Sequence, residues 1–291
     1  MLVDMKTILV AAQKGGYGVT APSIQNETTL RAAIEAAEQE NAPMILDMDY
    51  DANVDLLYFV RMCTDLAKES YVPIAINQDH GATYEEAVWG IRAGCTSIMP
   101  DRSSLSFEEN AKQVKELVKI AHAVGVSVEA ELGHVGIGEN YINDREAALT
   151  VPEEAKKFVE ITGVDCLAVA IGTAHGPYKG EPHIDFKRLE AIREVVNVPL
   201  VIHGGSGTGP ENLKRAIKGG ITKVNLGTDL YTVAVDACKE SNTIPYLKPY
   251  VFKDAFKNKL VEYIRLFEQN DRAGDISPMK KVVWNGPRVE Y

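Results

Sequence analysis

Short apolar runs bounded by turn-forming residues recur along the chain, and they predict buried β-strands. Runs of about four to eight apolar and β-branched residues are typical of strands that are covered on both faces. The eight predicted strands cover residues 17–21, 43–48, 73–77, 96–100, 126–132, 166–172, 199–204 and 223–228.

The segments between these runs carry apolar residues at helical spacing, together with residues that favour helices. Ser106 lies three residues before Glu109, as in a capping box. Gly94, Gly125 and Gly163 follow periodic stretches, where a glycine C-cap is expected. The clearest predicted helices cover residues 27–40, 84–94, 106–125 and 152–163.

Strand and helix thus alternate through most of the chain. Eight such units with buried strands predict an α/β fold of the closed (β/α)8 type, the TIM barrel, with a doubly wound open sheet as the alternative. Later residues are mostly helical. We therefore predict one barrel domain over 1–291, in which about 230–291 form a C-terminal helical extension and tail. Trp284 and Tyr291 in the tail are expected to pack on the barrel or on a second subunit.

Composition and charge narrow the range of partners. The 291 residues are 45% hydrophobic and 25% charged, as in an ordinary globular protein. A net charge of -10 disfavours nucleic acid and anionic membranes, and no apolar stretch approaches the ~20 residues that span a bilayer. A small anionic substrate stays possible because main-chain N–H groups can bind phosphate. Four widely spaced cysteines without a signal peptide predict reduced thiols and a cytoplasmic location.

Three histidines each lie at or just past the end of a predicted strand. His80 follows 73–77, His175 follows 166–172, and His203 lies at the end of the run 199–204. Any one of them alone would more often be an ordinary hydrogen-bonded residue. In a parallel barrel, however, the carboxyl ends of all strands meet at one face, so the three rings are expected to converge. Catalytic zinc commonly takes three protein ligands, often histidine, so a metal site is the leading hypothesis.

Many other ionisable or polar side chains fall in or near the same strand ends. Burial of this many such groups without partners would cost several kcal/mol each, and a cation is the simplest partner. Catalytic residues of such barrels come from these ends. The group comprises Asp47, Asp49, Asp79, Asp101, Glu129, Glu131 and Asn225.

Glycine-rich segments follow the last two predicted strands. Gly204, Gly205 and Gly207 allow the backbone to approach an anion, and Ser206 and Thr228 add hydroxyl groups. Barrels frequently bind phosphate in these two loops, although a simple chain reversal is the alternative. Neither a dinucleotide fingerprint nor a P-loop is present. With a metal and an aspartate nearby, this arrangement suits chemistry on a phosphorylated hydroxy-ketone.

Five motifs carry a resemblance to a known family: "QDHG" at 78–81, "SVEAELG" at 127–133, "GVDCLAVAIGTAHGPYKG" at 163–180, "VPLVIHGGSG" at 198–207 and "TKVNLGTDL" at 222–230. The chain resembles the class II, zinc-dependent ketose-bisphosphate aldolases, especially the tagatose- and fructose-bisphosphate branch, over almost its whole length. The resemblance implies an aldehyde-lyase of carbohydrate metabolism. Such an enzyme reversibly cleaves a ketose 1-phosphate or 1,6-bisphosphate to dihydroxyacetone phosphate and an aldehyde through a zinc-bound enediolate.

The resemblance also implies a role for individual residues. The Zn²⁺ ligands would be His80, His175 and His203. Asp79 would handle the proton of the C4 hydroxyl group, and Glu139 would exchange the proton at C3.

Further carboxylates and the phosphate site follow from the same resemblance. Asp101 and Glu131 match carboxylates that can hold the metal in an alternative position, and whether they bind a second metal is open. A Na⁺ or K⁺ ion often accompanies the phosphate site. The matching phosphate-site residues are Gly176, Lys179, Gly204, Gly205, Ser206, Asn225, Gly227 and Thr228.

The chain departs from the family pattern where the other end of the sugar would bind. Ser23 replaces an asparagine, Asp49 lies near a usual serine, and Arg102 replaces a glycine. Asp47, Asp49 and Asp51 would repel a distal phosphate unless paired, whereas Arg102 would bind such a group or pair with the aspartates. The distal group, which could be phosphate, sulfonate or neutral, and the stereochemistry at C4 therefore stay open.

Two alternative functions are weighed against this one. A Schiff-base aldolase on the same barrel would need a desolvated lysine, for which Lys179 is the candidate. A non-catalytic sugar-phosphate-binding barrel would keep the pocket without the reaction. A homodimer or homotetramer is the expected assembly.

Overall fold

The computed structural model describes residues 1–49, 53, 55–136, 138 and 149–277. Its centre is a parallel eight-stranded sheet in the order β1-β8-β7-β6-β5-β4-β3-β2. The bridge between Ser23 and Asp47 brings the two edge strands together, and the Ile24 N–H donates to the Asp47 carbonyl at 2.8 Å. The strands are β1 (Val19–Pro22), β2 (Met44–Asp49), β3 (Ile74–Gly81), β4 (Ser97–Pro100), β5 (Ser127–Leu132), β6 (Cys166–Val169), β7 (Leu200–Ile202) and β8 (Ile221–Leu226).

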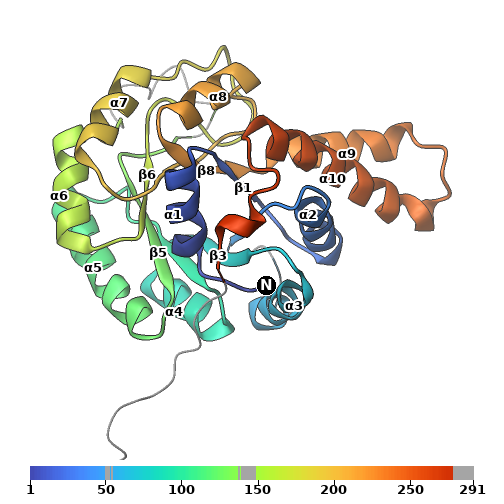
Figure 1. Ribbon diagram of the computed structural model, residues 1–291, viewed down its shortest axis with the longest axis horizontal. Helices are drawn as coiled ribbons and strands as arrows, with labels where there is room; N and C mark the ends of the chain where they lie inside the picture. The colour runs from blue at the N-terminus through green and yellow to red at the C-terminus, as the bar shows by residue number, and fades with distance from the viewer. Residues whose placement is uncertain (50–52, 54, 137, 139–148, 278–291) are drawn as a thin grey trace, which may run out of the picture.

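Helices surround this sheet and complete the predicted TIM barrel (Figure 1). All eight predicted strands are confirmed. So are the four clearest predicted helices, and Ser106 caps one of them by accepting from the Glu109 N–H at 3.3 Å. The helices are α1 (Met5–Gly15), α2 (Glu27–Gln39), α3 (Leu56–Glu69), α4 (Tyr84–Ala93), α5 (Phe107–Ala123), α6 (Pro152–Thr162), α7 (Phe186–Val195), α8 (Pro210–Lys218), α9 (Thr228–Glu240) and α10 (Lys248–Leu266), with short 3₁₀ turns at Pro245–Leu247 and Ala273–Asp275.

Helix α1 is an addition to the predicted set. It precedes the first strand and buries Met5, Ile8 and Leu9 against apolar side chains of the barrel interior, such as Ile45 and Val201. A second apolar layer lies between the strands and the outer helices. Because α1 contacts β3, β5 and β8 at their amino ends, it covers that end of the barrel. A site inside the barrel must therefore open at the carboxyl ends of the strands.

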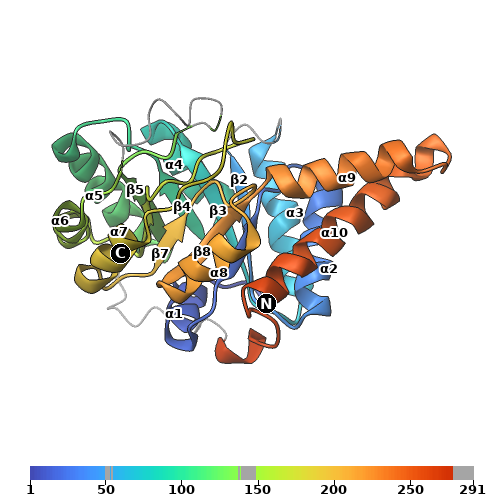
Figure 2. The same cartoon turned by 90° about the horizontal axis from the view of Figure 1, so that it is seen from above.

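The expected C-terminal extension consists of α9 and α10, which lie side by side and project from the barrel (Figure 2). Helix α10 is fixed to α2 by ion pairs of Lys253 with Glu35 at 2.7 Å and of Arg265 with Glu40, just beyond α2, at 2.8 Å. The tail from residue 278 onward, which includes Trp284 and Tyr291, lies outside the described residues. Within the described part of the chain, no helix is long and apolar enough to cross a membrane.

Candidate active site

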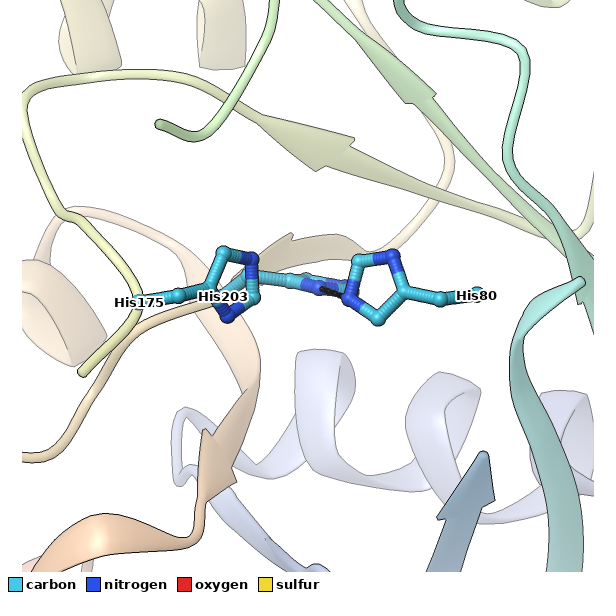
Figure 3. A group of neighbouring side chains, drawn as sticks. All are labelled: His80, His175 and His203. Atoms are coloured by element: carbon cyan, nitrogen blue, oxygen red, sulfur yellow. Dashed lines mark hydrogen bonds between the residues drawn. The ribbon is translucent and has the colours of Figure 1, made fainter. Parts of the chain in front are cut away.

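Three histidines from different strands converge at the carboxyl end of the barrel (Figure 3). His80 belongs to β3, His175 follows β6, and His203 follows β7 directly. Their ring centroids are 4.6 to 5.7 Å apart. One ring nitrogen of each lies within 4.8 Å of the other two. The spacing suits three ligands of a single metal ion.

Neighbouring carboxylates set the orientation of two of these rings. Asp101 lies 2.8 Å from Nδ1 of His80, and Glu129 lies 2.8 Å from Nε2 of His203. Because a carboxylate accepts hydrogen bonds, each of these nitrogens carries a hydrogen, and the opposite nitrogen is the one that points toward the metal position. These opposite nitrogens, Nε2 of His80 and Nδ1 of His203, lie 2.8 Å apart and share a hydrogen bond, in which His80, whose pKa is raised, donates to Nδ1 of His203. The ring orientation is the one that metal binding requires.

Burial and charge favour the neutral, ligating form of two histidines. Burial lowers the pKa of His175 to about 4 and holds that of His203 well below its usual range. Burial also disfavours the charged form of His80, but Asp79 and Asp101 outweigh it and raise its pKa to about 10. Burial raises the pKa of Glu131 to about 8. The site is thus crowded with acidic groups that a cation would stabilise.

Two buried oxygen atoms test whether the site fits a cation. Oδ1 of Asp79 and Oε2 of Glu131 have no hydrogen-bond partner among the described residues. Leaving a buried carboxylate oxygen unpaired is costly, and a divalent cation beside the histidines would remove that cost. His80, Asp101 and Glu131 also form a second group with metal-ligand spacing. The residues present therefore fit a metal, in more than one position.

A strained backbone brings Asp79 and His80 to the same pocket. Consecutive residues of a regular strand point to opposite faces, yet both of these line the pocket. His80 has a φ of 43°, in the left-handed region that a non-glycine residue seldom adopts, and the pairing of β3 with β4 shifts between Gln78 and Gly81. Asp79 is oriented by Asn225, whose Nδ2 donates to Oδ2 at 2.8 Å.

A helix N-terminus forms the other end of the site. Helix α9 begins at Thr228, and its first turn is capped from the neighbouring loop by Ser206, whose Oγ accepts from the N–H groups of Gly227 at 3.3 Å and Asp229 at 3.1 Å. Gly204 has a φ of +66°, and a Cβ there would lie 2.2 Å from the Ala174 carbonyl oxygen, so only glycine allows this approach. The N-terminus of α9 attracts anions, because the positive end of the helix dipole lies there.

One pocket of about 170 Å³ joins the histidines to this helix N-terminus. It brings together most of the residues that the sequence singled out. They are Ser23, Asp49, Asp79, His80, His175, Gly176, Gly204, Ser206, Asn225, Gly227 and Thr228, with Leu226 beside them.

Other sequence candidates do not line this pocket or lie outside the described residues. Gly205 packs against Asn225, to whose carbonyl its N–H donates at 3.1 Å, and a Cβ there would lie 2.4 Å from Val224. Lys179 is exposed and does not line the pocket. Glu139 lies outside the described residues, as does Asp51.

Arg102 differs most from its expected position beside the distal end of the sugar. Its guanidinium is buried and donates to the carbonyl groups of Gly81 at 2.8 Å and of Ala82 and Asp101 at 2.7 Å. Nε donates to Gln113 at 2.8 Å. These acceptors already satisfy the buried charge, so Arg102 holds the end of β3, which carries His80, and the loop that carries Asp101, and it does not face the substrate pocket.

Asp47 also differs from expectation, and the reason is a lysine that the sequence did not single out. Lys223 lies inside the barrel, 3.1 Å from Asp47 and 3.0 Å from Glu129. Asp47 therefore points into the barrel and does not face a distal phosphate. The available signal was a lysine in the middle of an apolar strand, but such a residue usually faces solvent.

Comparison with known proteins shows to which family the chain belongs. The family model described as "Fructose-bisphosphate aldolase class-II" matches residues 3–272. The chain belongs to this family. It is accordingly a class II, metal-dependent ketose-bisphosphate aldolase, an aldehyde-lyase that acts on a sugar phosphate. Membership also implies a divalent metal, typically zinc, which the histidine group fits.

Individual relatives agree with this assignment over nearly the full chain. A "Fructose-bisphosphate aldolase" from Thermus caldophilus is 40% identical over 94% of this chain and 100% of its own length. The crystal structure of the YdjI aldolase from Escherichia coli K12 is 35% identical, with a TM-score of 0.86 over 94% of this chain and 100% of that one. The Campylobacter jejuni fructose-bisphosphate aldolase, at 20% identity and a TM-score of 0.77 over 93% of this chain and 96% of that one, shows the shared fold alone.

Proposed function

We propose that this aldolase reversibly cleaves a ketose 1-phosphate, or a related 1,6-bisphosphate, to dihydroxyacetone phosphate and an aldehyde, with zinc held by His80, His175 and His203. The observation that carries this proposal is that the histidine group, a buried aspartate and a helix N-terminus share one pocket. When bound, zinc supplies a Lewis acid that polarises the ketone and stabilises negative charge on its oxygen.

Two carboxylates, Asp79 and Glu139, would each carry out one of the two proton transfers. Asp79, held by Asn225 through one oxygen, would accept the C4 hydroxyl proton on the other as the C3–C4 bond breaks. Glu139 would return a proton to C3, an assignment that rests on the family resemblance. Asp101 and Glu131 would offer the metal its alternative position.

The phosphate group of the substrate would bind at the start of α9. Ser206, Gly227 and Thr228 line the pocket together with Gly176 and Gly204, and Na⁺ or K⁺ would be an accompanying ion. Main-chain N–H groups and the helix dipole explain how a chain with a net charge of -10 binds an anion. Lys179, exposed in this structure, would reach the phosphate only from the rim.

The distal end of the sugar would lie near Ser23 and Asp49. Asp49 brings a carboxylate to the pocket, and the Arg102 guanidinium is committed to backbone carbonyls. Like charges in proximity disfavour binding. Because the Arg102 guanidinium does not face the pocket, we favour a substrate with a neutral, hydroxylated distal end over one with a distal phosphate or sulfonate.

A panel of ketose 1-phosphates tests this specificity. The compounds differ in C4 configuration and carry a hydroxyl, phosphate or sulfonate at the distal carbon, and a coupled assay detects released dihydroxyacetone phosphate before and after chelation. We expect the highest kcat/KM for a neutral distal group, with loss of activity on chelation. Asp49→Ser should raise kcat/KM for the bisphosphate by about tenfold, equivalent to about 1.4 kcal/mol. Inactivity across the whole panel would contradict the proposed reaction.

The structure also bears on the Schiff-base alternative. A Schiff-base lysine must be desolvated and uncharged, but Lys179 is exposed. Lys223 is buried, and although burial lowers its pKa, Asp47 and Glu129 outweigh this and raise it. A lysine held as an ammonium ion is not a nucleophile, so neither lysine suits that chemistry.

We further propose a homodimer or homotetramer in the cytoplasm. The projecting helices and the turn between them expose large apolar side chains that a second copy of this chain would cover. The exposed side chains are Val233, Val235, Ile244, Tyr246 and Tyr250.

A further inference from the structure

A fully buried lysine lies inside the barrel, between two carboxylates from different strands. Lys223 of β8 contacts Asp47 of β2 at 3.1 Å and Glu129 of β5 at 3.0 Å, and none of the three side chains is more than 1% exposed. Taking an ammonium group and carboxylates out of water costs several kcal/mol each, and apolar residues of similar size would often be as stable or more so. The cluster is therefore weak as a device for stability, which points to a role in the site above it.

Glu129 links this lysine to the histidine group. Its Oε2 faces Lys223, while its Oε1 lies 2.8 Å from Nε2 of His203. Oε2 is thus ion-paired with Lys223 and also accepts from Cys166 Sγ at 3.7 Å, while Oε1 is hydrogen-bonded to His203, so turning the carboxylate would break these contacts. Because Oε1 accepts the Nε2–H, the lone pair of His203 lies on Nδ1, which faces His80.

The other side of the lysine is equally fixed. Oδ1 of Asp47 accepts from Nδ2 of Asn77 at 2.8 Å, and Oδ1 of Asn77 accepts from the Ser97 hydroxyl at 2.7 Å. The chain of contacts therefore runs from β4 across β3 and β2 to Lys223, and from there to Glu129 and His203. Side chains anchored at both ends in this way are held in one geometry.

We propose that Lys223 is a positioning residue for the metal centre: its ammonium group fixes the Glu129 carboxylate, which receives the Nε2–H of His203 and so presents Nδ1 to the metal. The proposal rests on His203 being a metal ligand, as proposed above. Lys223 itself touches neither the substrate nor the metal position. Lys223 acts through Glu129 to fix the tautomer and the orientation of the His203 ring.

Zinc affinity tests this role without recourse to the reaction. The dissociation constant for zinc is measured on chelator-treated protein by competition with a chromogenic chelator, for wild type, Lys223→Met and Lys223→Gln. Both variants are expected to bind zinc about 10- to 100-fold more weakly, as is typical when the partner of a metal ligand is lost. Thermal unfolding of each metal-free protein establishes that it is folded.

Lys6→Met serves as the matched control. Lys6 lies on α1 at the amino end of the barrel and pairs with Asp165 at 2.8 Å, so this variant also removes a lysine from a carboxylate. Its zinc dissociation constant should stay within about threefold of wild type, because, among the described residues, neither Lys6 nor Asp165 contacts a histidine of the metal group. Unchanged zinc affinity in folded Lys223→Met and Lys223→Gln would overturn the proposal.

¹⁵N NMR of the metal-free wild-type protein gives a test that does not depend on the variants folding. The expected spectrum shows His203 with hydrogen on Nε2 and bare Nδ1, and Lys223 as an ammonium ion at neutral pH. Hydrogen on Nδ1 of His203, or an uncharged Lys223, would overturn the proposal. A wild-type protein that binds no zinc would instead contradict the proposed metal centre itself.

Discussion

Asp79→Asn is expected to lower kcat by about 10²- to 10⁴-fold while the protein keeps its metal, because general base catalysis typically contributes that much. The amide is nearly the same size as the carboxylate but cannot accept a proton. Asp79 is buried, its Oδ2 is held by Asn225 at 2.8 Å, and its Oδ1 has no hydrogen-bond partner among the described residues. The oxygen that would receive the proton is thus already in place and available.

The measurement combines kcat with zinc content for the purified variant. Asp49→Asn, which makes the same chemical change in the same pocket, is the control and should shift KM for a phosphorylated distal group more than kcat. A near-normal kcat in Asp79→Asn would remove Asp79 from the reaction. Loss of zinc in that variant would show instead that Asp79 acts on the metal.

His203→Ala is expected to lose bound zinc and, with it, cleavage activity. The ring is fully buried and presents Nδ1 toward His80, so its removal leaves two histidines for a site that needs three ligands. The loss in zinc affinity should exceed the roughly 10- to 100-fold that follows from losing the partner of a ligand. It also removes the hydrogen-bond donor of buried Glu129.

Metal analysis of dialysed protein measures this effect, and circular dichroism checks the fold. His122→Ala is the control, because His122 lies on α5 and contacts Asp165 at 2.8 Å, away from the pocket. That variant should keep both zinc and activity. Full zinc occupancy in His203→Ala would overturn the ligand assignment.

The fold could be predicted because its signals are local. Each strand is a short apolar run, each clear helix carries its own periodicity, and the count of eight units leads to a closed barrel. Helix α1 was missed although Met5, Ile8, Leu9 and Ala12 have helical spacing, because an element before the first strand is not part of the alternating pattern. Only the assembled barrel shows the apolar surface that it covers.

The histidine group could also be anticipated, because parallel strands bring their carboxyl ends together whatever their order. The directions in which individual side chains point could not be predicted from the sequence. Arg102 was expected at the sugar, but three carbonyl groups at the end of β3 and in its own loop take up its guanidinium. Those acceptors come together only in the folded chain.

The alternation of side chains along β8 explains why Lys223 could not be identified as an interior residue from the sequence. Residues two apart on a strand face the same side, so Lys223 and Asn225 both point inward, with Asn225 nearer the pocket. The sequence shows this spacing but not which face is the interior. That assignment needs the register of β8 against β1 and β7, which fixes Lys223 opposite Val19 and Val201.

Exchange of the C3 hydrogen of dihydroxyacetone phosphate in D₂O, followed by ¹H NMR, tests the central claim most directly because it needs only the half of the substrate that does not vary. With metal bound, one C3 hydrogen should be replaced by deuterium; chelation should stop the exchange, and zinc should restore it. Binding without exchange in the zinc-loaded protein would indicate a non-catalytic pocket, and exchange that survives complete metal removal would indicate Schiff-base chemistry. Either result would contradict a reaction that depends on the metal held by His80, His175 and His203.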